Sequence, residues 1–378
     1  MSARAKGRIA CFHLLNNYSG SPNVLAGVVE GLLAHGYEVD LFTSRGPGHL
    51  SGIRGARYHH LAYSWHRSRK LTAARYCFAQ AQLLLAPLLT YRSDEDVLFY
   101  VNTQAPLAAA LAGWASGRQV LYHLHEHYIV KDPLKRLAKL VKERTAAKAI
   151  CVSQYLVDQE ATATGVVIYN SLSDDFFERA KAGRKKKSGK ARRCVLQISA
   201  LRNYKGIGQF AEVARRLPQY DFILVADASA KEVAEYAVAV RAPFNMRVFS
   251  TQRDVHPFYR DADILVNMTL PDLCRESFGM TILEGMAYGL PAIVPPAGGP
   301  LELVDEEKNG YRVDPYAIGT VAEKIDFLLT HDSVYSEMSR RAREKAERFD
   351  RERQVAAIVG EIEAMRSADR WSAGGIPR

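Results

Sequence analysis

The chain has 378 residues, of which 48% are hydrophobic and 24% charged, and this size fits two ordinary globular domains rather than one. Its net charge of +10 and pI near 9.3 favour an anionic partner, such as a phosphorylated substrate, an anionic membrane surface or nucleic acid. The five cysteines are scattered without a Cys-x-x-Cys pair, which argues against a disulfide framework or a zinc site and fits a reducing cytoplasm.

The apolar segments of the chain are too short to serve as a signal peptide or to cross a membrane. Residues 9–15 are interrupted by His13 and end at two asparagines, so they do not form a signal-peptide core. The most apolar helix candidate, residues 76–91, contains Gln80 and Pro87 and is shorter than the ~20 apolar residues that a spanning helix needs. We therefore expect a cytoplasmic protein, either soluble or attached peripherally to the inner face of the plasma membrane.

Buried strands and amphipathic helices alternate along the first half of the chain. Residues 8–15 predict a strand, and a turn then leads into a helix that starts near Ser21 and Pro22, residue types suited to a cap and a first turn. A strand at 38–43 completes a unit that opens a parallel sheet. Further strands are expected at 97–101, 119–125, 149–152 and 166–169, with helices at 106–114, at 131–148 and after Ser153.

A basic run, Arg184-Lys-Lys-Lys187, separates the two halves and has no apolar anchor, so it predicts a linker; a nucleic-acid or nuclear-targeting tract is the alternative. The same alternation then resumes, which predicts a second doubly wound half. We place a first domain at 1–178, a linker at 179–193, a second domain at 194–350, and at 351–378 a C-terminal helix that can pack back on the first domain, with a tail. Ligands of such sheets bind beyond the carboxyl ends of the strands.

The segment from Glu276 to Pro291 carries the most information about function. Glu276 precedes an apolar helix and Glu284 lies inside it, while Gly279 and the helix start provide backbone N–H groups that attract a phosphate. Carboxylates on either side can accept hydrogen bonds from hydroxyls, so the segment matches a nucleotide sugar, which has a sugar, a diphosphate and a ribose in series. The alternative is one acid favoured by the helix dipole and one solvated glutamate.

The surrounding pattern resembles a known family. The block Glu-x-Phe-Gly-x-x-x-x-Glu-x-Met-Ala-x-Gly-x-Pro, followed by Gly298-Gly-Pro-Leu-Glu302, resembles the donor-site signature of the GT4 family of retaining glycosyltransferases. The resemblance covers most of the chain and is strongest over 194–315. It implies an α/β protein of GT-B architecture, with two Rossmann-like doubly wound domains facing a central cleft. The first domain would bind the acceptor and the second the nucleotide-sugar donor.

The resemblance also implies roles for residues of the second domain. Glu276 would hold sugar hydroxyls near the reacting carbon, and Glu284 would hold the ribose. The backbone N–H groups of Phe278, Gly279 and Met280 would contact the donor diphosphate.

The loop after the first strand of the second domain, Arg202-Asn-Tyr-Lys205, would hold the diphosphate with its two cations in place of a metal ion. The commoner family pattern has the arginine earlier relative to Lys-Gly, so Arg202 departs from it. Two solvated loop cations are the alternative. In the first domain, Gly20 would allow backbone to approach the ligand closely, although many family members have Gly-Gly where this chain has Ser-Gly.

The sequence His123-Leu-His125-Glu126-His127 ends a strand of the first domain. Strand period would put the three histidines on one face, which suggests a metal site, but no acidic or cysteine cluster completes one. The resemblance makes His125 a ligand of the transferred sugar and Glu126 an acceptor-side group, while His123 fits a core position. Asp261-Ala-Asp263 has the form of a metal-binding Asp-x-Asp, but its place before a strand favours local hydrogen bonding.

The predicted helix at 131–148 has a basic face interleaved with leucines, which can lie on an anionic bilayer or simply be a solvated surface. We expect a metal-independent hexosyltransferase without a cofactor, acting in cell-surface polysaccharide or lipopolysaccharide synthesis. Its expected partners are a nucleotide-sugar donor, a glycan or lipid-linked acceptor and an anionic membrane surface, but not nucleic acid. The alternatives are a sugar-nucleotide epimerase or hydrolase of the same fold and a non-enzymatic anionic-surface binder.

Overall fold

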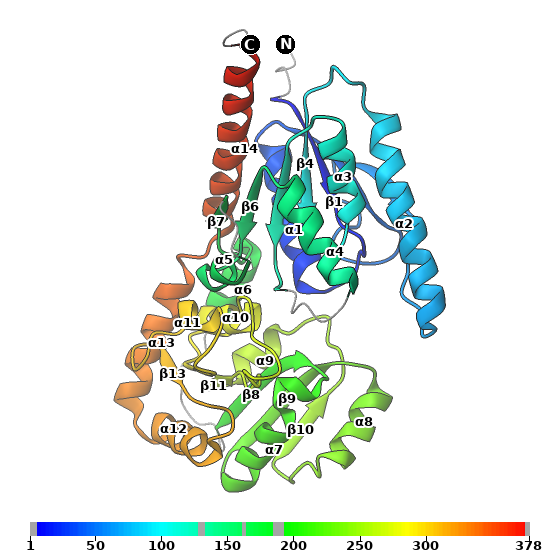
Figure 1. The fold of residues 1–378 in the computed structure, drawn as a ribbon. Coiled ribbons are helices and arrows are strands. Elements are labelled where there is room, and N and C mark those ends of the chain that lie inside the picture. Colours follow the sequence, from blue (N-terminus) through cyan, green and yellow to red (C-terminus); the bar gives the residue numbers. More distant parts are fainter. Residues whose placement is uncertain (1–5, 128–132, 161–163, 184–192, 375–378) are drawn as a thin grey trace. The chain divides into compact units, whose positions relative to one another are not determined.

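The computed structural model describes residues 6–127, 133–160, 164–183 and 193–374 (Figure 1). The chain divides into two compact units, one formed by Met1–Ser171 with Arg351–Arg378 and the other by Leu172–Asp350. Each unit contains a parallel sheet with helices packed against it, so the expected α/β architecture with two Rossmann-like domains is confirmed.

The first unit contains a seven-stranded sheet in the order β3-β2-β1-β4-β5-β6-β7, and its strands pair in parallel. The strand order reverses between β1 and β4, and such a switch point is where doubly wound sheets place ligands. The strands are β1 (Arg8–Phe12), β2 (Glu38–Ser44), β3 (Arg57–Leu61), β4 (Val97–Asn102), β5 (Val120–Leu124), β6 (Lys148–Cys151) and β7 (Gly165–Val167).

Helices cover both faces of this sheet. Ile9 and Cys11 of β1 are buried with apolar residues of the first and last helices of the unit. On the opposite face, Phe12 stacks on Phe42 and contacts Phe99 at a tilted angle. The helices of the unit are α1 (Gly20–Ala34), α2 (Arg69–Thr90), α3 (Leu107–Ala115), α4 (Pro133–Thr145), α5 (Gln154–Glu160) and α14 (Arg351–Gly374). The second, third and fourth helices of the chain, α2, α3 and α4, lie side by side over the face of the sheet that contains Phe12 (Figure 1).

The second unit contains a six-stranded sheet in the order β10-β9-β8-β11-β12-β13, with its switch point between β8 and β11. The strands are β8 (Cys194–Ala200), β9 (Asp221–Asp227), β10 (Met246–Phe249), β11 (Ile264–Val266), β12 (Ala292–Val294) and β13 (Gly310–Arg312). The helices are α6 (Asp174–Ala182), the short 3-10 turn η1 (Asn203–Lys205), α7 (Ile207–Arg216), α8 (Ala230–Ala239), α9 (His256–Asp261), α10 (Met280–Ala287), α11 (Pro300–Leu303), α12 (Ile318–Thr330) and α13 (Asp332–Ala346).

The division between the units differs from the boundaries expected from the sequence. The first division falls between Ser171 and Leu172 rather than at residue 178, because α6 contacts α9 and α10. The segment expected to be the linker is flanked on both sides by the second unit, and its residues 184–192 lie outside the described ranges. The C-terminal helix α14 contacts α1 and belongs to the first unit. It continues to Gly374.

In the described ranges, no helix combines the length and the apolar character needed to cross a bilayer.

Candidate functional site

The switch point of the second unit brings a cation and a carboxylate together. Lys205 ends the turn η1 that follows β8, and its Nζ forms an ion pair with Oε1 of Glu276, which lies in the segment between β11 and α10. The hydroxyl of Thr269 donates to the same carboxylate oxygen over 3.2 Å. Burial alone would lower the pKa of Lys205, but the charge and hydrogen bond of Glu276 outweigh it and raise that pKa. Lys205 therefore carries its charge at neutral pH.

Two glycines hold the backbone next to Glu276 in place. The N–H of Gly299 donates to the carbonyl oxygen of Glu276 over 2.9 Å. A Cβ on Gly298 would lie 2.5 Å from that oxygen, and one on Gly299 would lie 2.2 Å from the carbonyl oxygen of Ser277. Since real Cβ atoms do not approach so closely, only glycine fits at these two positions. The Gly-Gly turn therefore sets the position of the Glu276 carboxylate.

Helix α10 begins immediately beyond this segment. Gly279 precedes it with φ of 104°, a left-handed conformation that side chains disfavour. Within the first turn of α10, the N–H groups of Ile282 and Leu283 donate to the carbonyl oxygen of Gly279 over 3.0 and 3.2 Å, whereas those of Met280 and Thr281 precede the first such bond. Phe278 is buried and packs against Phe349, which fixes the turn. The four positions from Glu276 to Met280 that were selected from the sequence thus form one short turn at the switch point.

The second glutamate of the motif lies inside α10 and has a different partner. The hydroxyl of Tyr259 in α9 donates to Oε2 of Glu284 over 2.5 Å. Burial raises the pKa of Glu284 to about 7, even though the Tyr259 hydrogen bond lowers it. The helix lies close to the sheet because Gly285 has no side chain: a Cβ there would meet Leu265 of β11 at 2.8 Å.

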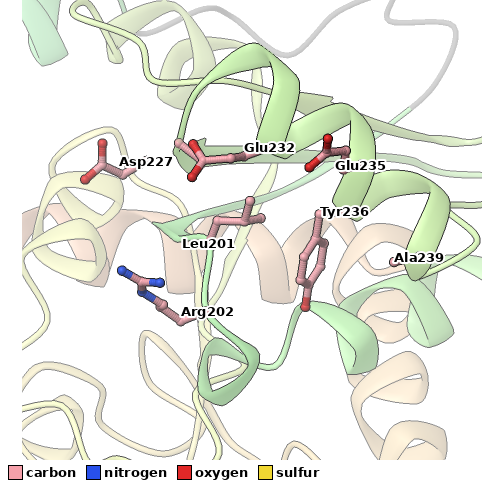
Figure 2. A pocket seen from close by; sticks show the side chains of 8 residues that line it. Leu201, Arg202, Asp227, Glu232, Glu235, Tyr236 and Ala239 are labelled. Carbon is pink, nitrogen blue, oxygen red and sulfur yellow. The ribbon is translucent and has the colours of Figure 1, made fainter. Parts of the chain in front are cut away.

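Arg202 lies at a pocket of about 370 Å³ beyond the carboxyl ends of β8 and β9 (Figure 2). Asp227, at the end of β9, and Tyr236, of α8, line the same pocket. Arg202 and Lys205 both belong to the loop after β8, but only Lys205 pairs with Glu276 in the described part of the chain. The two loop cations thus have different surroundings: Lys205 lies beside Glu276, and Arg202 lines the pocket.

The switch point of the first unit holds two histidines joined by an amide. Asn102 ends β4, and its Nδ2 lies 3.3 Å from the carbonyl oxygen of Ser21 and 2.9 Å from Nδ1 of His13. Its Oδ1 lies 2.8 Å from Nε2 of His125, just after β5. A carbonyl oxygen can only accept, so the amide end near Ser21 must be the NH₂ group, and Oδ1 must then accept from His125.

This arrangement defines the state of the His125 ring. Burial lowers the pKa of His125 well below its ordinary value, and the neighbouring His123 and His13 lower it further, so the ring is neutral. Because Nε2 carries the proton that Asn102 accepts, the lone pair is on Nδ1. His125 can therefore accept one hydrogen bond at Nδ1, for example from a hydroxyl. The pKa of His13 is also lowered by burial, to about 4.

The three histidines of the β5 motif turn to different partners. His123 Nδ1 is paired with the hydroxyl of Tyr100 at 2.7 Å, in the core. His127 Nδ1 lies 2.8 Å from Glu160, a buried carboxylate that also pairs with Lys142. His123 is thus a buried core residue, as expected from the sequence, and His127 belongs to a separate charged cluster.

The remaining predicted site residues of the first unit are near the surface. Gly20 is the first residue of α1 and has open space around the position of a Cβ, so the helix starts before the predicted cap Ser21. Glu126 is exposed. In the second unit, Asp263 is buried and accepts from the N–H of Cys194 over 2.8 Å, at the start of β8. Asp263 thus has a hydrogen-bonding role, as expected, but its partner is 69 residues away in the sequence rather than local.

Sequence reasoning missed several residues of these clusters. Tyr259, Asn102 and His13 are distant in sequence from the residues they contact, and no local pattern marks them. Thr269 lies close to Glu276 in sequence, but no pattern marks it either. The one available signal is positional: Asn102 and His13 are polar residues at the carboxyl ends of apolar strands, where parallel sheets carry ligand-binding side chains.

Comparison with known families agrees with this geometry. Residues 178–348 match the family described as Glycosyl transferases group 1, and residues 19–162 match the Glycosyl transferase 4-like domain. The fold and these two matches define a glycosyltransferase with two Rossmann-like domains. The chain belongs to the group 1 glycosyltransferases, of the GT4 type, which confirms the resemblance found in the donor-site block.

Curated relatives match mainly over short segments. The probable sucrose-phosphate synthase 5 of Oryza sativa is 34% identical over 98 residues, which are 26% of this chain and 10% of that protein. The chain thus spans about a tenth of the length of that relative. An uncharacterized glycosyltransferase of Haemophilus influenzae is 22% identical over 277 residues, covering 70% of this chain and 75% of that protein.

Solved structures match over nearly the whole chain. The Anabaena protein HepE in complex with UDP-glucose has a TM-score of 0.75 and 19% identity, covering 95% of this chain and 100% of that one. The sucrose-phosphate synthase of Thermosynechococcus elongatus has a TM-score of 0.76 and 17% identity, covering 96% and 100%. At these identities the likeness establishes the GT-B fold.

Proposed function

We propose that the protein transfers a hexosyl group from a nucleotide-diphosphate sugar to a hydroxyl of a glycan or lipid-linked acceptor, with retention at the anomeric carbon. The single observation that carries this proposal is the Lys205–Glu276 pair at the switch point, beside the start of α10. Such a site offers a fixed cation and helix N–H groups to a diphosphate and a carboxylate to sugar hydroxyls. The bound UDP-glucose of HepE supports a donor of this class.

The proposed chemistry is electrostatic. As the bond between the anomeric carbon and the diphosphate oxygen breaks, negative charge develops on the leaving diphosphate. Lys205, Arg202 and the N–H groups of Phe278, Gly279 and Met280 stabilise that charge, so no essential metal ion or cofactor is required. The acceptor oxygen bonds to the anomeric carbon, and its proton passes to the departing diphosphate oxygen. Preorganised groups of this kind are effective because they need no rearrangement when the charge appears.

The other site residues orient the donor and the acceptor. Glu276 binds hydroxyls of the transferred sugar, Glu284 binds the ribose, and His125 accepts a hydrogen bond from the sugar at Nδ1. Gly20 allows the backbone at the start of α1 to approach the ligand closely. Glu126 is a group on the acceptor side of the site. The GT4-type membership supports retention. We assign the reaction to cell-surface polysaccharide or lipopolysaccharide synthesis at the cytoplasmic face of the membrane.

A thermal-shift screen of the purified protein against UDP-, GDP-, ADP- and dTDP-sugars tests the donor site. A donor at a concentration a hundredfold above its Kd stabilises the folded state by about 2.7 kcal/mol, or roughly 5–10 °C in Tm for a domain of this size. We expect one nucleotide to give such a shift, Glu284→Ala to abolish it, and Glu323→Ala, an exposed glutamate of α12, to retain it.

The reaction itself is tested by following donor consumption with and without candidate acceptors. Consumption that depends on an acceptor supports transfer. Donor turnover at the same rate without an acceptor contradicts the proposal and points to a sugar-nucleotide epimerase or hydrolase. If no donor shifts the Tm of a folded sample and none is consumed, the donor-site assignment is wrong.

A further inference from the structure

Helix α2 of the first unit has an apolar side turned outward. From Leu71 to Leu89, all of which the structure describes, every exposed residue is Leu, Ala, Phe or Cys. Leu89 is 85% exposed, Phe78 58% and Leu85 55%. We call this surface the α2 face, and its residues are Leu71, Ala73, Ala74, Cys77, Phe78, Ala81, Leu84, Leu85, Leu88 and Leu89.

The inner side of the same helix is held by polar groups. Tyr76 donates from its hydroxyl to the carbonyl oxygen of Ala105 over 3.0 Å. Gln80 donates to that carbonyl over 2.9 Å and accepts from the N–H of Ala108 over 3.0 Å. Gln82 accepts from the N–H of Ala62 over 2.8 Å. The core side also contains the buried Ala79, Leu83 and Pro87. A surface helix normally turns its apolar stripe to the core and a polar side to water, whereas α2 has apolar residues on both sides.

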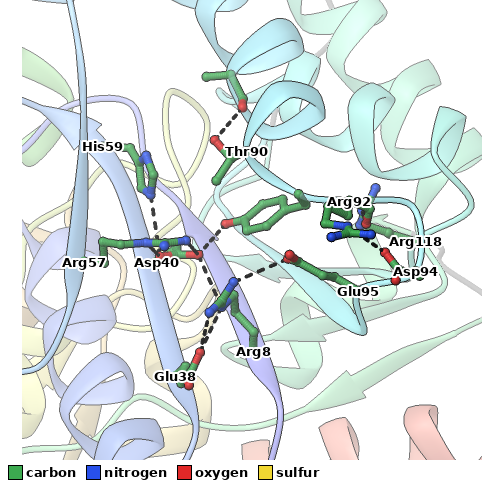
Figure 3. A network of polar contacts seen from close by, with 12 residues as sticks. Arg8, Glu38, Asp40, Arg57, His59, Thr90, Arg92, Asp94, Glu95 and Arg118 are labelled. Atoms are coloured by element: carbon green, nitrogen blue, oxygen red, sulfur yellow. Dashed lines mark hydrogen bonds and ion pairs between the residues drawn. The ribbon is translucent and has the colours of Figure 1, made fainter.

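The end of α2 is also fixed to the sheet. Tyr91, directly after the helix, donates to the buried carboxylate of Asp40 in β2 over 2.7 Å. Figure 3 shows Asp40 beside Arg57 and His59, which also contact its carboxylate. Arg57 forms a two-point contact with the same carboxylate. Burial raises the pKa of Asp40, but hydrogen bonds from His59, Arg57 and Tyr91 outweigh burial and hold that pKa well below its ordinary value. The α2 face therefore belongs to a rigidly attached helix.

Charge is distributed unevenly around the α2 face. Arg67, Arg69 and Lys70 are exposed at its amino-terminal end. The acidic residues at the other end are paired, Asp94 with Arg92 at 3.4 Å and Glu95 with Arg8 at 3.4 Å. The surface as a whole thus combines apolar side chains with net positive charge.

Helix α4 shows the same combination of exposed apolar and positively charged side chains. It lies beside α3, which lies beside α2 (Figure 1). Leu137 and Leu140 are exposed on α4 together with Arg136 and Arg144, and Arg144 lies over the ring of the half-exposed Trp114 of α3 at 5.3 Å. Aromatic, aliphatic and cationic side chains in one layer are the composition of surfaces that enter the headgroup region of a bilayer.

We infer that the α2 face, with the basic residues at its start and along α4, binds the surface of an anionic lipid bilayer. The leucines and Phe78 enter the boundary between headgroups and acyl chains, and the arginines and lysines contact the anionic headgroups. A second copy of the chain fits less well, because it would bring the same positive charges together. This surface does not depend on the proposed function, although it would serve a lipid-linked acceptor.

Co-sedimentation with vesicles tests this inference without any donor present. We expect the full-length protein to bind vesicles of 30% phosphatidylglycerol in phosphatidylcholine at least tenfold more tightly than phosphatidylcholine alone, with binding that weakens as salt rises. Leu85→Glu with Leu89→Glu should lower that binding at least tenfold. Phe244→Glu is the matched control, since Phe244 is 82% exposed but lies in the second unit.

A dye on Cys77 reports the location of the α2 face directly. Cys77 is exposed on this face, whereas Cys11, Cys151 and Cys194 are buried, so a Cys274→Ser protein can be labelled at Cys77 alone. Vesicles should shift the emission of an environment-sensitive dye to shorter wavelength and protect it from iodide. The same dye at Phe244→Cys in a Cys77→Ser, Cys274→Ser protein should not change.

Three outcomes would overturn the inference. The first is no binding of the unmodified protein to anionic vesicles. The second is binding that the Leu85 and Leu89 substitutions leave unchanged. The third is a dimer in light scattering that these substitutions dissociate, with no vesicle binding, which would assign the face to self-association. Donor binding in the thermal-shift screen would be unaffected by any of them, so failure here is distinct from failure of the proposed function.

Discussion

The two switch points of the molecule are built from opposite kinds of side chain. In the first unit, His13, Asn102 and His125 are linked by hydrogen bonds, and burial keeps both rings neutral. In the second unit, Lys205 and Glu276 face each other as full charges. The same topological position thus presents neutral hydrogen-bonding groups in one sheet and an ion pair in the other.

This difference follows from what each site has to bind. A diphosphate carries charge through the reaction and needs a fixed cation, whereas hydroxyl groups need donors and acceptors of defined direction. A protonated histidine in the first unit could no longer accept from a hydroxyl. We therefore interpret the first switch point as a hydroxyl-binding site and the second as a diphosphate-binding site, in line with the proposed function.

The largest expected effect is at the charged switch point. Removing Lys205 takes away the cation that would stabilise the leaving diphosphate, so Lys205→Ala should lower the rate of transfer about 10²–10³-fold. Steady-state kinetics with the identified donor measure this loss. Lys231→Ala, which removes an exposed lysine of α8, is the control and should retain full activity.

Because Lys205→Ala also leaves Glu276 without its partner, the double variant with Glu276→Gln separates the two effects. If the pair acts as one unit, the losses of the single variants will not add. If Lys205→Ala retains activity within threefold of the unmodified protein, the charged switch point does not take part in the reaction.

The neutral switch point predicts a smaller effect with a distinctive pH dependence. Asn102→Asp should lower turnover about tenfold and, because a carboxylate favours protonation of the neighbouring ring, raise the pKa of His125. Activity should then fall at acidic pH in the variant, where the unmodified protein shows no such loss from His125. The pH profile of the transfer rate measures this.

Destabilisation alone would not produce that profile. Asn245→Leu is the control, since Asn245 is a buried amide of the second unit that donates to Ala214, Leu217 and Tyr220. It should lower Tm without changing the shape of the pH profile. An unchanged profile in Asn102→Asp would show that Asn102 has only a structural role.

Much of the fold and of the second switch point could be predicted because the signals are local. Glu276, Gly279 and Glu284 lie in one segment, and the left-handed φ of Gly279 is a backbone requirement that a glycine marks in the sequence. The capping box of α8, Ser229 with Glu232, was also a local signal, although that helix was missed. The edge strand β3 was not predicted, because its residues show no clean alternation of polar and apolar side chains.

The neutral switch point and the α2 face could not be predicted, for physical reasons. Asn102 meets His13 and His125 only because three strands end side by side, and the sequence does not specify that register. The leucines of α2 predict burial by their composition, yet burial depends on which side the polar anchors such as Gln80 draw to the core. Long-range packing thus decided both features.

The last expected effect is on donor binding rather than on turnover, and it concerns the carboxylate assigned to the ribose. Only an ionised Glu284 accepts hydrogen bonds from both ribose hydroxyls, and its pKa is about 7. Donor affinity should therefore rise about tenfold between pH 6 and pH 8, as the ionised fraction increases. Isothermal titration of the donor measures this change. Glu284→Gln should bind weakly and without this dependence.

The same raised pKa has a consequence for stability that checks the assignment without any ligand. Folded Glu284 holds its proton up to a higher pH than the unfolded chain does, so its contribution to stability is present below about pH 4.5 and is lost as the pH rises through about 7. Glu284→Gln lacks this loss and should gain stability relative to the unmodified protein by about 1–3 kcal/mol at pH 8. Equal stability of the two proteins at both pH 5 and pH 8 would contradict a half-buried, proton-holding Glu284. The pH dependence of donor affinity would then have to arise from the diphosphate or from another residue at the charged switch point.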